Sequence, residues 1–495
     1  MLNSILHKSI ITFSFTCVFA NFLGAQWVQK GVDIDGEFEQ ERLGAAMAMN
    51  ADGNIVAVGG IGGSFGPTAA LRTRVFEWSG SSWQQKGSSL TSHSTDVSLN
   101  DEGNRLAVGF DLEGEGWTFG EGVVRIFEWD GSDWIIMGDS LKGDDDDDDF
   151  GYNVELNMEG DVVVVGARNS GSGPTAPGYV KVFEWDGSSW LQKGSKIIGE
   201  AAWDEFGYRV SINDSGNVIA VGGRHNDEVA NYAGHARVFQ WDGSDWIQRG
   251  EDIDGEFEYD QFGSGIALDG SGNTVAIGAN NSDFGSTMNC GQVRIFDWDG
   301  ESWNQRGETI YGPGYQALAG SAIDMSRDGN FVAVGAHWYL SETGMVQVFM
   351  WYDNAWVQVG SDLVGEAVDD RSGHRVQLSE SGYVVASSAL DNDDGGDLAG
   401  HLRVYELADA GISNSEKMTF NIFPNPATDQ VFLSLDGVDG LQSVRVLDCV
   451  GQEVMNLKPK NLSEGISIGL LEAGTYVIEM VSTDSEAIRK SFIKK

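Results

Sequence analysis

Cysteine, proline and basic residues are all scarce in this chain of 495 residues. It contains 3 Cys and 7 Pro, and its 31 Lys and Arg face 75 Asp and Glu, which gives a formal net charge of −44. So few cysteines exclude a disulfide framework. The acidity excludes nucleic acid as a partner, because binding to phosphates requires a basic surface. Stability must therefore come from the core or from closure of the fold.

Long apolar runs are missing after the N-terminus. The stretch from Ile10 to Leu23 follows Lys8 and ends in the small residues Gly24 and Ala25, which predicts a signal peptide over residues 1–25. No later stretch approaches the roughly 20 apolar residues of a membrane-spanning helix. We therefore expect an exported, monomeric protein without a transmembrane segment.

A repeated unit dominates the rest of the sequence. It begins as RVFEWSGSSW at Arg74, recurs in five further copies, and is cut short as RVYEL at Arg403. One aromatic residue marks each copy, at intervals of 51 to 57 residues: Phe76, Phe127, Phe183, Phe239, Phe296, Phe349 and Tyr405. This period matches a four-stranded propeller blade with generous loops. The sequence predicts an all-β fold with a seven-bladed β-propeller over residues 26–407.

The two ends of the repeat region complement each other. The seventh copy has no outer strand, while WVQKG at Trp27 is an outer strand with no preceding partner. Pairing of this N-terminal strand with the strand around Tyr405 closes the ring and leaves no radial edge free. We expect the N-terminal strand to complete the last blade.

Within the repeats, FG at Phe150, Phe206 and Phe262 opens the first strand of a blade, and VGA at Val165 ends a second strand. The units resemble the FG-GAP repeats of integrin-type propellers. Short turns such as NDSGN at Asn213 stand where calcium-binding members of that family carry Asp-rich loops. The resemblance therefore implies the propeller fold without the family's calcium sites.

The C-terminal part has a different pattern. After a polar linker at 408–417, residues 418–495 contain FPNP at Phe423, GQEV at Gly451 and AGTYVIEM at Ala473. They resemble the type A sorting domain of type IX secretion substrates in Bacteroidota. The resemblance implies a small Ig-like β-sandwich, handling by the type IX secretion machinery, and a location outside the cell or on its outer surface.

Acidic residues recur at the same two positions of the loop that precedes the first strand of a blade. Five blades carry the pair: Glu37 and Glu41, Asp144 and Asp148, Glu200 and Asp204, Glu256 and Asp260, Glu366 and Asp370. One interpretation is a ring that binds a cation or a basic ligand. The other, which we favour, is internal salt bridges with the base near the start of the third strand. Six blades have that base: Arg74, Arg125, Lys181, Arg237, Arg294 and Arg403.

The densest run of charge is a weaker candidate for a metal site. Six carboxylates follow one another at Asp144, Asp145, Asp146, Asp147, Asp148 and Asp149. A bound Ca²⁺ would relieve their repulsion, although a solvated loop does so nearly as well. No other cofactor is expected. Six Trp pairs, such as Trp78 with Trp83, are expected to pack across strands and not to bind sugars.

The functional prediction rests on loops. Variable segments join the second and third strands at 59–72, 110–122 and 168–178, on the face that carries the acidic pairs. A rigid ring presenting diverse loops favours a secreted or surface recognition module for a glycan or a protein. No HExxH or Cys-His arrangement occurs, and His235 and His401, equivalent in the repeat, suggest packing. The alternative is a polysaccharide-degrading enzyme that uses carboxylates of the propeller face.

Overall fold

The computed structural model describes most of the propeller region and parts of the C-terminal region. The described residues are 26–61, 72–91, 94–110, 122–145, 148–169, 176–408, 419–423, 427–428, 430–436, 441–447, 453–457, 466–471, 474–482 and 487–495. The predicted signal peptide and much of the three variable loops lie outside them. The chain divides into two compact units, one spanning 22–409 and the other containing 410–495.

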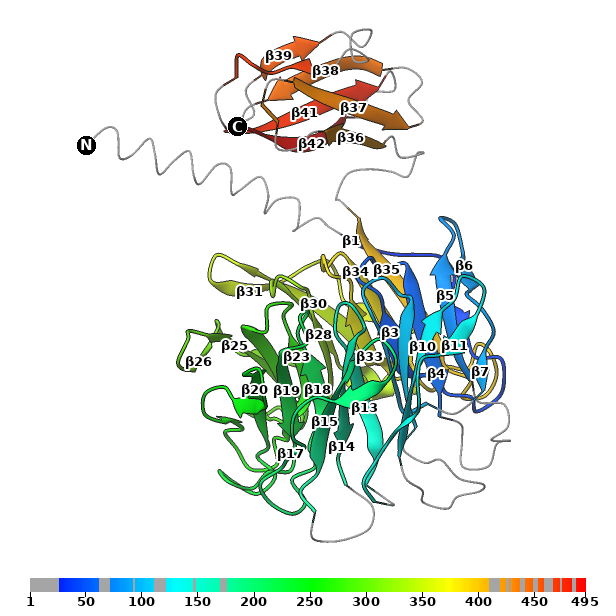
Figure 1. Ribbon diagram of the computed structural model, residues 1–495, viewed down its shortest axis with the longest axis vertical. Helices are drawn as coiled ribbons and strands as arrows, with labels where there is room; N and C mark the ends of the chain where they lie inside the picture. The colour runs from blue at the N-terminus through cyan, green and yellow to red at the C-terminus, as the bar shows by residue number, and fades with distance from the viewer. Residues whose placement is uncertain are drawn as a thin grey trace, which may run out of the picture. The chain divides into compact units, whose positions relative to one another are not determined.

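The larger unit consists of seven antiparallel sheets (Figure 1). In each sheet the strands follow one another outwards, and we name them a, b, c and d from the inner edge. Strand d is interrupted, and its continuation is a fifth strand of two residues that pairs back onto strand c. The sequence predicted four strands in each blade, and the structure adds this short strand to each of them.

Strand bounds are given blade by blade in chain order. Blade 1 contains β3 (Leu43–Met49), β4 (Ile55–Gly60), β5 (Arg72–Trp78), β6 (Trp83–Gln85) and β7 (Leu90–Thr91). Blade 2 contains β8 (Asp96–Leu99), β9 (Arg105–Phe110), β10 (Val123–Trp129), β11 (Trp134–Ile136) and β12 (Leu141–Lys142). Blade 3 contains β13 (Phe150–Leu156), β14 (Val162–Ala167), β15 (Tyr179–Trp185), β16 (Trp190–Gln192) and β17 (Ile197–Ile198). Blade 4 contains β18 (Phe206–Ile212), β19 (Val218–Gly223), β20 (His235–Trp241), β21 (Trp246–Gln248) and β22 (Ile253–Asp254).

The remaining blades follow the same plan. Blade 5 contains β23 (Phe262–Leu268), β24 (Thr274–Ala279), β25 (Gln292–Trp298), β26 (Trp303–Gln305) and β27 (Ile310–Tyr311). Blade 6 contains β28 (Ala322–Met325), β29 (Phe331–Gly335), the helical turn α2 (Tyr339–Glu342), β30 (Met345–Tyr352), β31 (Ala355–Gln358) and β32 (Leu363–Val364). Blade 7 contains β33 (Ser372–Leu378), β34 (Val384–Ala389) and β35 (His401–Ala408), together with β1 (Gln26–Gln29) and β2 (Ile34–Asp35).

The core lies between neighbouring blades. Strand β14, with the sequence VVVVGA, is buried at every position because a blade covers each of its faces, and β9 differs only at Arg105, which is partly exposed. One apolar cluster joins Ala57 of blade 1 with Leu106 and Phe127 of blade 2, and other clusters join other neighbouring blades in the same way. A blade is therefore stable only between two neighbours, so the ring depends on its closure.

The closure predicted from the sequence is confirmed. Strand β1 pairs antiparallel with β35, and Trp27 lies opposite Leu407. The indole Nε1 of Trp27 donates to the carbonyl oxygen of Val359 in blade 6 at 2.9 Å. The same bond joins each strand d to the preceding blade, with Trp83, Trp134, Trp190, Trp246, Trp303 and Trp356 as donors. Seven equivalent bonds thus run around the whole ring, and Trp27 completes the circle.

The Trp pairs pack as the sequence predicted. Trp78 and Trp83 face each other across strands c and d with ring centroids 5.3 Å apart, and the other five pairs are 5.2 to 5.5 Å apart. Gly31, just after the outer strand of blade 7, has no room for a side chain, because a Cβ there would lie 2.7 Å from the Trp78 ring of blade 1. The pairs therefore clamp the outer strands together.

The C-terminal unit is a small β-sandwich with two sheets. One sheet contains β36 (Thr419–Phe423), β37 (Gln430–Asp436) and β40 (Ile466–Ser467). The other contains β38 (Leu441–Leu447), β39 (Glu453–Leu457), β41 (Gly474–Ser482) and β42 (Ala487–Lys494). Its core includes Val431, Val444 and Ile478. The expected sandwich is thus present.

Candidate functional site

Two kinds of loop form one face of the propeller, which we call the loop face. The d-a loops lead from strand d to strand a of the next blade, and the b-c loops join strands b and c. Both lie at the ends of the blades where the short strands β7 and β17 are found (Figure 1). A b-c loop is bonded to the neighbouring d-a loop, as where Tyr259 N donates to Asn231 O at 2.8 Å. Where the structure describes them, the two kinds of loop therefore lie side by side on the loop face.

The first acid of each pair forms an ion pair with strand c of its own blade. Five such pairs occur: Glu37 with Arg74, Asp144 with Lys181, Glu200 with Arg237, Glu256 with Arg294, and Glu366 with Arg403. The distances are 3.0 Å for Arg74 and 2.9 Å for Arg294. The bases are largely buried and the acids are 36 to 55% exposed. The structure therefore contains the salt bridges that the sequence favoured.

The second acid of each pair is buried and organises its own loop. These residues are Glu41, Asp148, Asp204, Asp260 and Asp370. Asp204 accepts the backbone N–H of Ala201 at 2.8 Å, and Asp370 accepts that of Ala367 at the same distance. Burial raises the pKa of Asp260 to about 6, against the opposing effect of a hydrogen bond from Ser282. These carboxylates thus hold the backbone of their own loops in place. Ligand binding by the acidic ring stays a prediction.

The two blades without the full pair use other partners. Arg125 donates from Nε to Oγ of Ser140 at 3.3 Å, and Gln347 donates to Asp362 at 3.0 Å. Thr91 ends the short strand β7, and Ala317 is buried. The position on strand c thus makes polar contacts even where the acid is missing.

Three described members of the Asp144–Asp149 run, Asp144, Asp148 and Asp149, already have side-chain partners. Asp144 pairs with Lys181 and Lys196, both at 2.5 Å, and Asp149 pairs with Arg168 at 3.1 Å. Asp146 and Asp147 lie outside the described residues. Binding of Ca²⁺ here stays a prediction, and the described contacts already offset much of the repulsion that motivated it.

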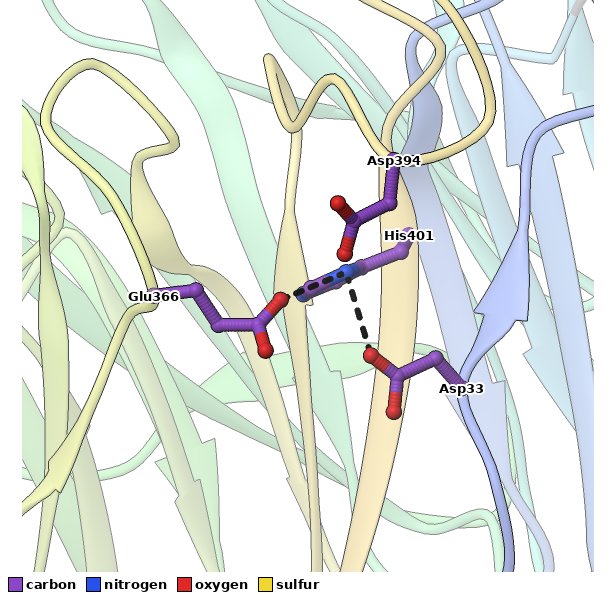
Figure 2. A group of neighbouring side chains, drawn as sticks. All are labelled: Asp33, Glu366, Asp394 and His401. Carbon is purple, nitrogen blue, oxygen red and sulfur yellow. Dashed lines mark ion pairs between the residues drawn. The ribbon is translucent and has the colours of Figure 1, made fainter.

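A second acidic group contains a histidine. Asp33, Glu366, Asp394 and His401 converge at the loop-face end of blade 7 (Figure 2). His401 is only 2% exposed. Burial, together with the positive charge of Arg403, lowers the pKa of His401. Sequence reasoning assigned His401 to packing and did not select Asp33 or Asp394. The available signal was that DIDGEFE occurs twice, at Asp33 and at Asp252.

Exposed aromatic side chains gather on the loop face. They come from d-a and b-c loops of blades 4 to 6, and we call them the aromatic band: Trp203, Tyr232, Phe257, Tyr259, Phe284, Tyr315 and Trp338. Phe257 and Tyr315 are more than 60% exposed. Tyr232 and Tyr259 stack across two neighbouring loops with centroids 5.8 Å apart. Exposed aromatic surface of this extent marks a binding surface more often than a bare exterior.

The centre of the ring contains a polar cavity of about 220 Å³. Burial raises the pKa of Glu155 to about 8 and that of Asp324 to about 7. Both carboxyls accept backbone N–H groups from the next blade: Ile212 donates to Glu155 at 3.3 Å and Leu378 to Asp324 at 2.6 Å. The two carboxyls therefore provide hydrogen-bond acceptors for backbone N–H groups at the inner edges of the neighbouring blades. Near the opposite face from the loops, Arg327 pairs with Asp101, Asp214 and Glu380.

Comparison with known proteins identifies the C-terminal unit. Residues 421–495 match the family described as the secretion system C-terminal sorting domain. The chain is a seven-bladed propeller sorted by type IX secretion. This export places the protein at the cell surface or in the extracellular space. No curated protein matches the chain. Among the described residues, no helix is long and apolar enough to cross a membrane. The FG-GAP resemblance stays a prediction.

Proposed function

We propose that the propeller is an extracellular recognition module that binds a polysaccharide on its loop face. The observation that carries this proposal is the aromatic band. Flat aromatic rings pack against the apolar faces of sugar rings, and nearby carboxylates accept hydrogen bonds from the sugar hydroxyls. The stacked pair of Tyr232 and Tyr259 offers such a surface on two adjacent loops.

Charge narrows the class of polysaccharide. Glu256, Glu258 and Glu228 surround the band and are exposed, and the chain as a whole has a formal charge of −44. A uronic acid or sulfated polymer would meet repulsion, especially at low ionic strength. We therefore propose a neutral or amino-sugar polymer as the ligand.

Affinity electrophoresis of the mature protein in gels containing neutral, amino-sugar or acidic polysaccharides tests this function. We expect retardation by at least one neutral or amino-sugar polymer and none by the acidic ones. Y259A should lose the retardation. Y383A should keep it, because Tyr383 is also exposed but lies in an a-b turn on the opposite face.

The same samples distinguish binding from hydrolysis. Reducing ends should not increase when the retarding polysaccharide is incubated with the protein. An increase that is lost in a variant of a loop-face carboxylate would favour the polysaccharide-degrading enzyme instead. Retardation that is unaffected by Y259A would refute docking on the aromatic band.

A further inference from the structure

Blade 7 brings four potential metal ligands together. One ligand atom each from Asp33, Glu366, Asp394 and His401 lie within 4.8 Å of one another (Figure 2). Nδ1 of His401 is 3.6 Å from Oδ2 of Asp33 and 4.0 Å from Oε2 of Glu366. This buried nitrogen has no hydrogen-bond partner. A buried imidazole nitrogen that faces carboxylates without a hydrogen bond requires an explanation.

Blade 4 repeats the arrangement. Glu200, His235 and Asp252 form a group of the same kind, and Asp252 also belongs to a group with Glu228 and Asp254. Nδ1 of His235 is 3.3 Å from Oδ2 of Asp252. His235 is fully buried, and neither of its ring nitrogens has a hydrogen-bond partner. Nδ1 thus lacks a hydrogen-bond partner in both histidines.

The two groups correspond residue by residue. His235 and His401 both begin strand c, and Glu200 and Glu366 are both first acids of a d-a loop. Their b-c loops share a turn in which Glu228 N donates to Asn226 Oδ1 at 3.0 Å and Asp394 N donates to Asn392 Oδ1 at 2.9 Å. The same geometry has therefore been built twice from different stretches of the chain.

A glutamine fixes the aspartate in both groups. Gln29 donates to Oδ1 of Asp33 at 2.5 Å, and Gln248 donates to Oδ1 of Asp252 at 2.6 Å. In each case the other oxygen, Oδ2, is the one that faces the histidine. Such support of a ligating carboxylate by a hydrogen bond from behind is common at metal sites.

The fold itself does not require a histidine at this position. The other five blades start strand c at the equivalent position with residues of quite different chemistry: Arg72, Val123, Tyr179, Gln292 and Met345. The aspartate also occurs in blade 6 as Asp362, but there Met345 replaces the histidine and Pro313 replaces the first acid. Histidine, aspartate and first acid occur together only in the two groups described here, among the blades as the structure describes them.

Nearby arginines reduce the negative charge without cancelling it. Arg403 bonds Oδ2 of Asp33 at 2.7 Å and also pairs with Glu366. Three carboxylates and one guanidinium leave a charge of −2 beside His401. Arg237 instead donates to Gln248 at 2.6 Å and lies 3.6 Å from both Glu200 and Asp252. Oδ2 of Asp252 is therefore better placed for an ion than Oδ2 of Asp33.

We propose that blades 4 and 7 each bind one divalent transition-metal ion, such as Zn²⁺, through histidine Nδ1 and the surrounding carboxylates. An imidazole ligand favours Zn²⁺ over Ca²⁺, which takes oxygen ligands. Zinc bonds of 2.0 to 2.2 Å require ligand atoms about 3.4 Å apart. The exposed side chains of Glu200, Glu228, Glu366 and Asp394 supply the small movement needed. Blade 4 is the tighter site, because Arg237 competes less for its aspartate.

Equilibrium dialysis of the chelator-treated mature protein against micromolar Zn²⁺, with the bound metal counted by mass spectrometry, tests the proposal. We expect two ions in the wild type, one in H235Q, one in H401Q and none in the double variant. H225Q is the matched control, because His225 lies in a loop next to Glu205, outside both groups. It should retain both ions.

Variants of exposed ligands guard against effects of misfolding. E228Q and D394N alter only exposed loop side chains and should each weaken one site by tenfold or more while the melting temperature without metal is unchanged. Wild-type protein that binds no Zn²⁺, or a double histidine variant that still binds two ions, would overturn the proposal. Binding of Ca²⁺ in preference to Zn²⁺ would also overturn it, because the histidines would then have no part.

Discussion

Closure of the ring by β1 leads to a quantitative prediction. Trp27 is 8% exposed, packs with Phe331 and Val376, and donates its indole N–H to Val359. Truncation of a buried Trp to Ala costs about 3 to 5 kcal/mol, and loss of the hydrogen bond alone about 1 kcal/mol. We therefore expect W27F to lower the free energy of unfolding by about 1 to 2 kcal/mol and W27A by about 3 to 5 kcal/mol.

Deletion of residues 26–31 should have a larger effect than either substitution. It removes the four backbone pairs between β1 and β35 and leaves the edge of β35 open. Denaturant unfolding followed by tryptophan fluorescence measures the loss, and hydrogen exchange locates it. Amides of β35 should lose protection first in the deletion variant.

A matched substitution separates closure from ordinary packing. Trp303 donates the equivalent hydrogen bond within the continuous part of the ring, so W303A should destabilise the protein about as much as W27A but leave the amides of β35 protected. If the deletion variant unfolds at the same denaturant concentration as the wild type, the role of β1 in closing the ring is refuted.

Three further predictions concern charge and export. Burial raises the pKa of Glu155 to about 8. The stability that this residue contributes is therefore complete below pH 4.5 and is lost as the pH rises through 8. Unfolding curves at pH 5 and pH 8.5 should show that E155Q is more stable than the wild type, by about a few kcal/mol, only at the higher pH. The double variant E256Q/D260N should lower the free energy of unfolding by about 1 to 3 kcal/mol, because Arg294 loses its partner. Added calcium should not restore the lost stability. A calcium-dependent rise in the melting temperature of the wild type alone would contradict the salt-bridge account. A chain ending at Ser415 should accumulate in the periplasm on immunoblots of cell fractions, and its normal appearance at the cell surface would exclude sorting through the C-terminal unit.

Much of the fold could be predicted because the sequence of the propeller consists of repeated units. The copies around Phe76 to Tyr405 set the number of blades, and the unpaired WVQKG at Trp27 revealed the closure. The division of strand d into two short pieces was not predicted. It depends on how residues such as Gly31 fit beneath the Trp rings of the next blade, which the spacing of the repeat does not show.

The candidate site was predictable only in part. Pairing of Glu256 with Arg294 follows from two residues at fixed positions in the repeat. The group around His401 draws on Asp33, which is 368 positions away along the chain and adjacent only because the ring closes. The aromatic band likewise combines loops of three blades that have no common motif. Such sites depend on tertiary contacts that a one-dimensional pattern does not contain.

Binding measured with loop-face variants tests the central claim most directly. Isothermal titration of the retarding polysaccharide into wild-type protein, Y259A, W203A and Y383A compares exposed aromatic residues on opposite faces of the same ring. We predict at least a tenfold loss of affinity for Y259A and W203A, and an affinity within twofold of the wild type for Y383A. Equal affinities for all four proteins, or a loss confined to Y383A, would contradict the assignment of the loop face as the recognition surface.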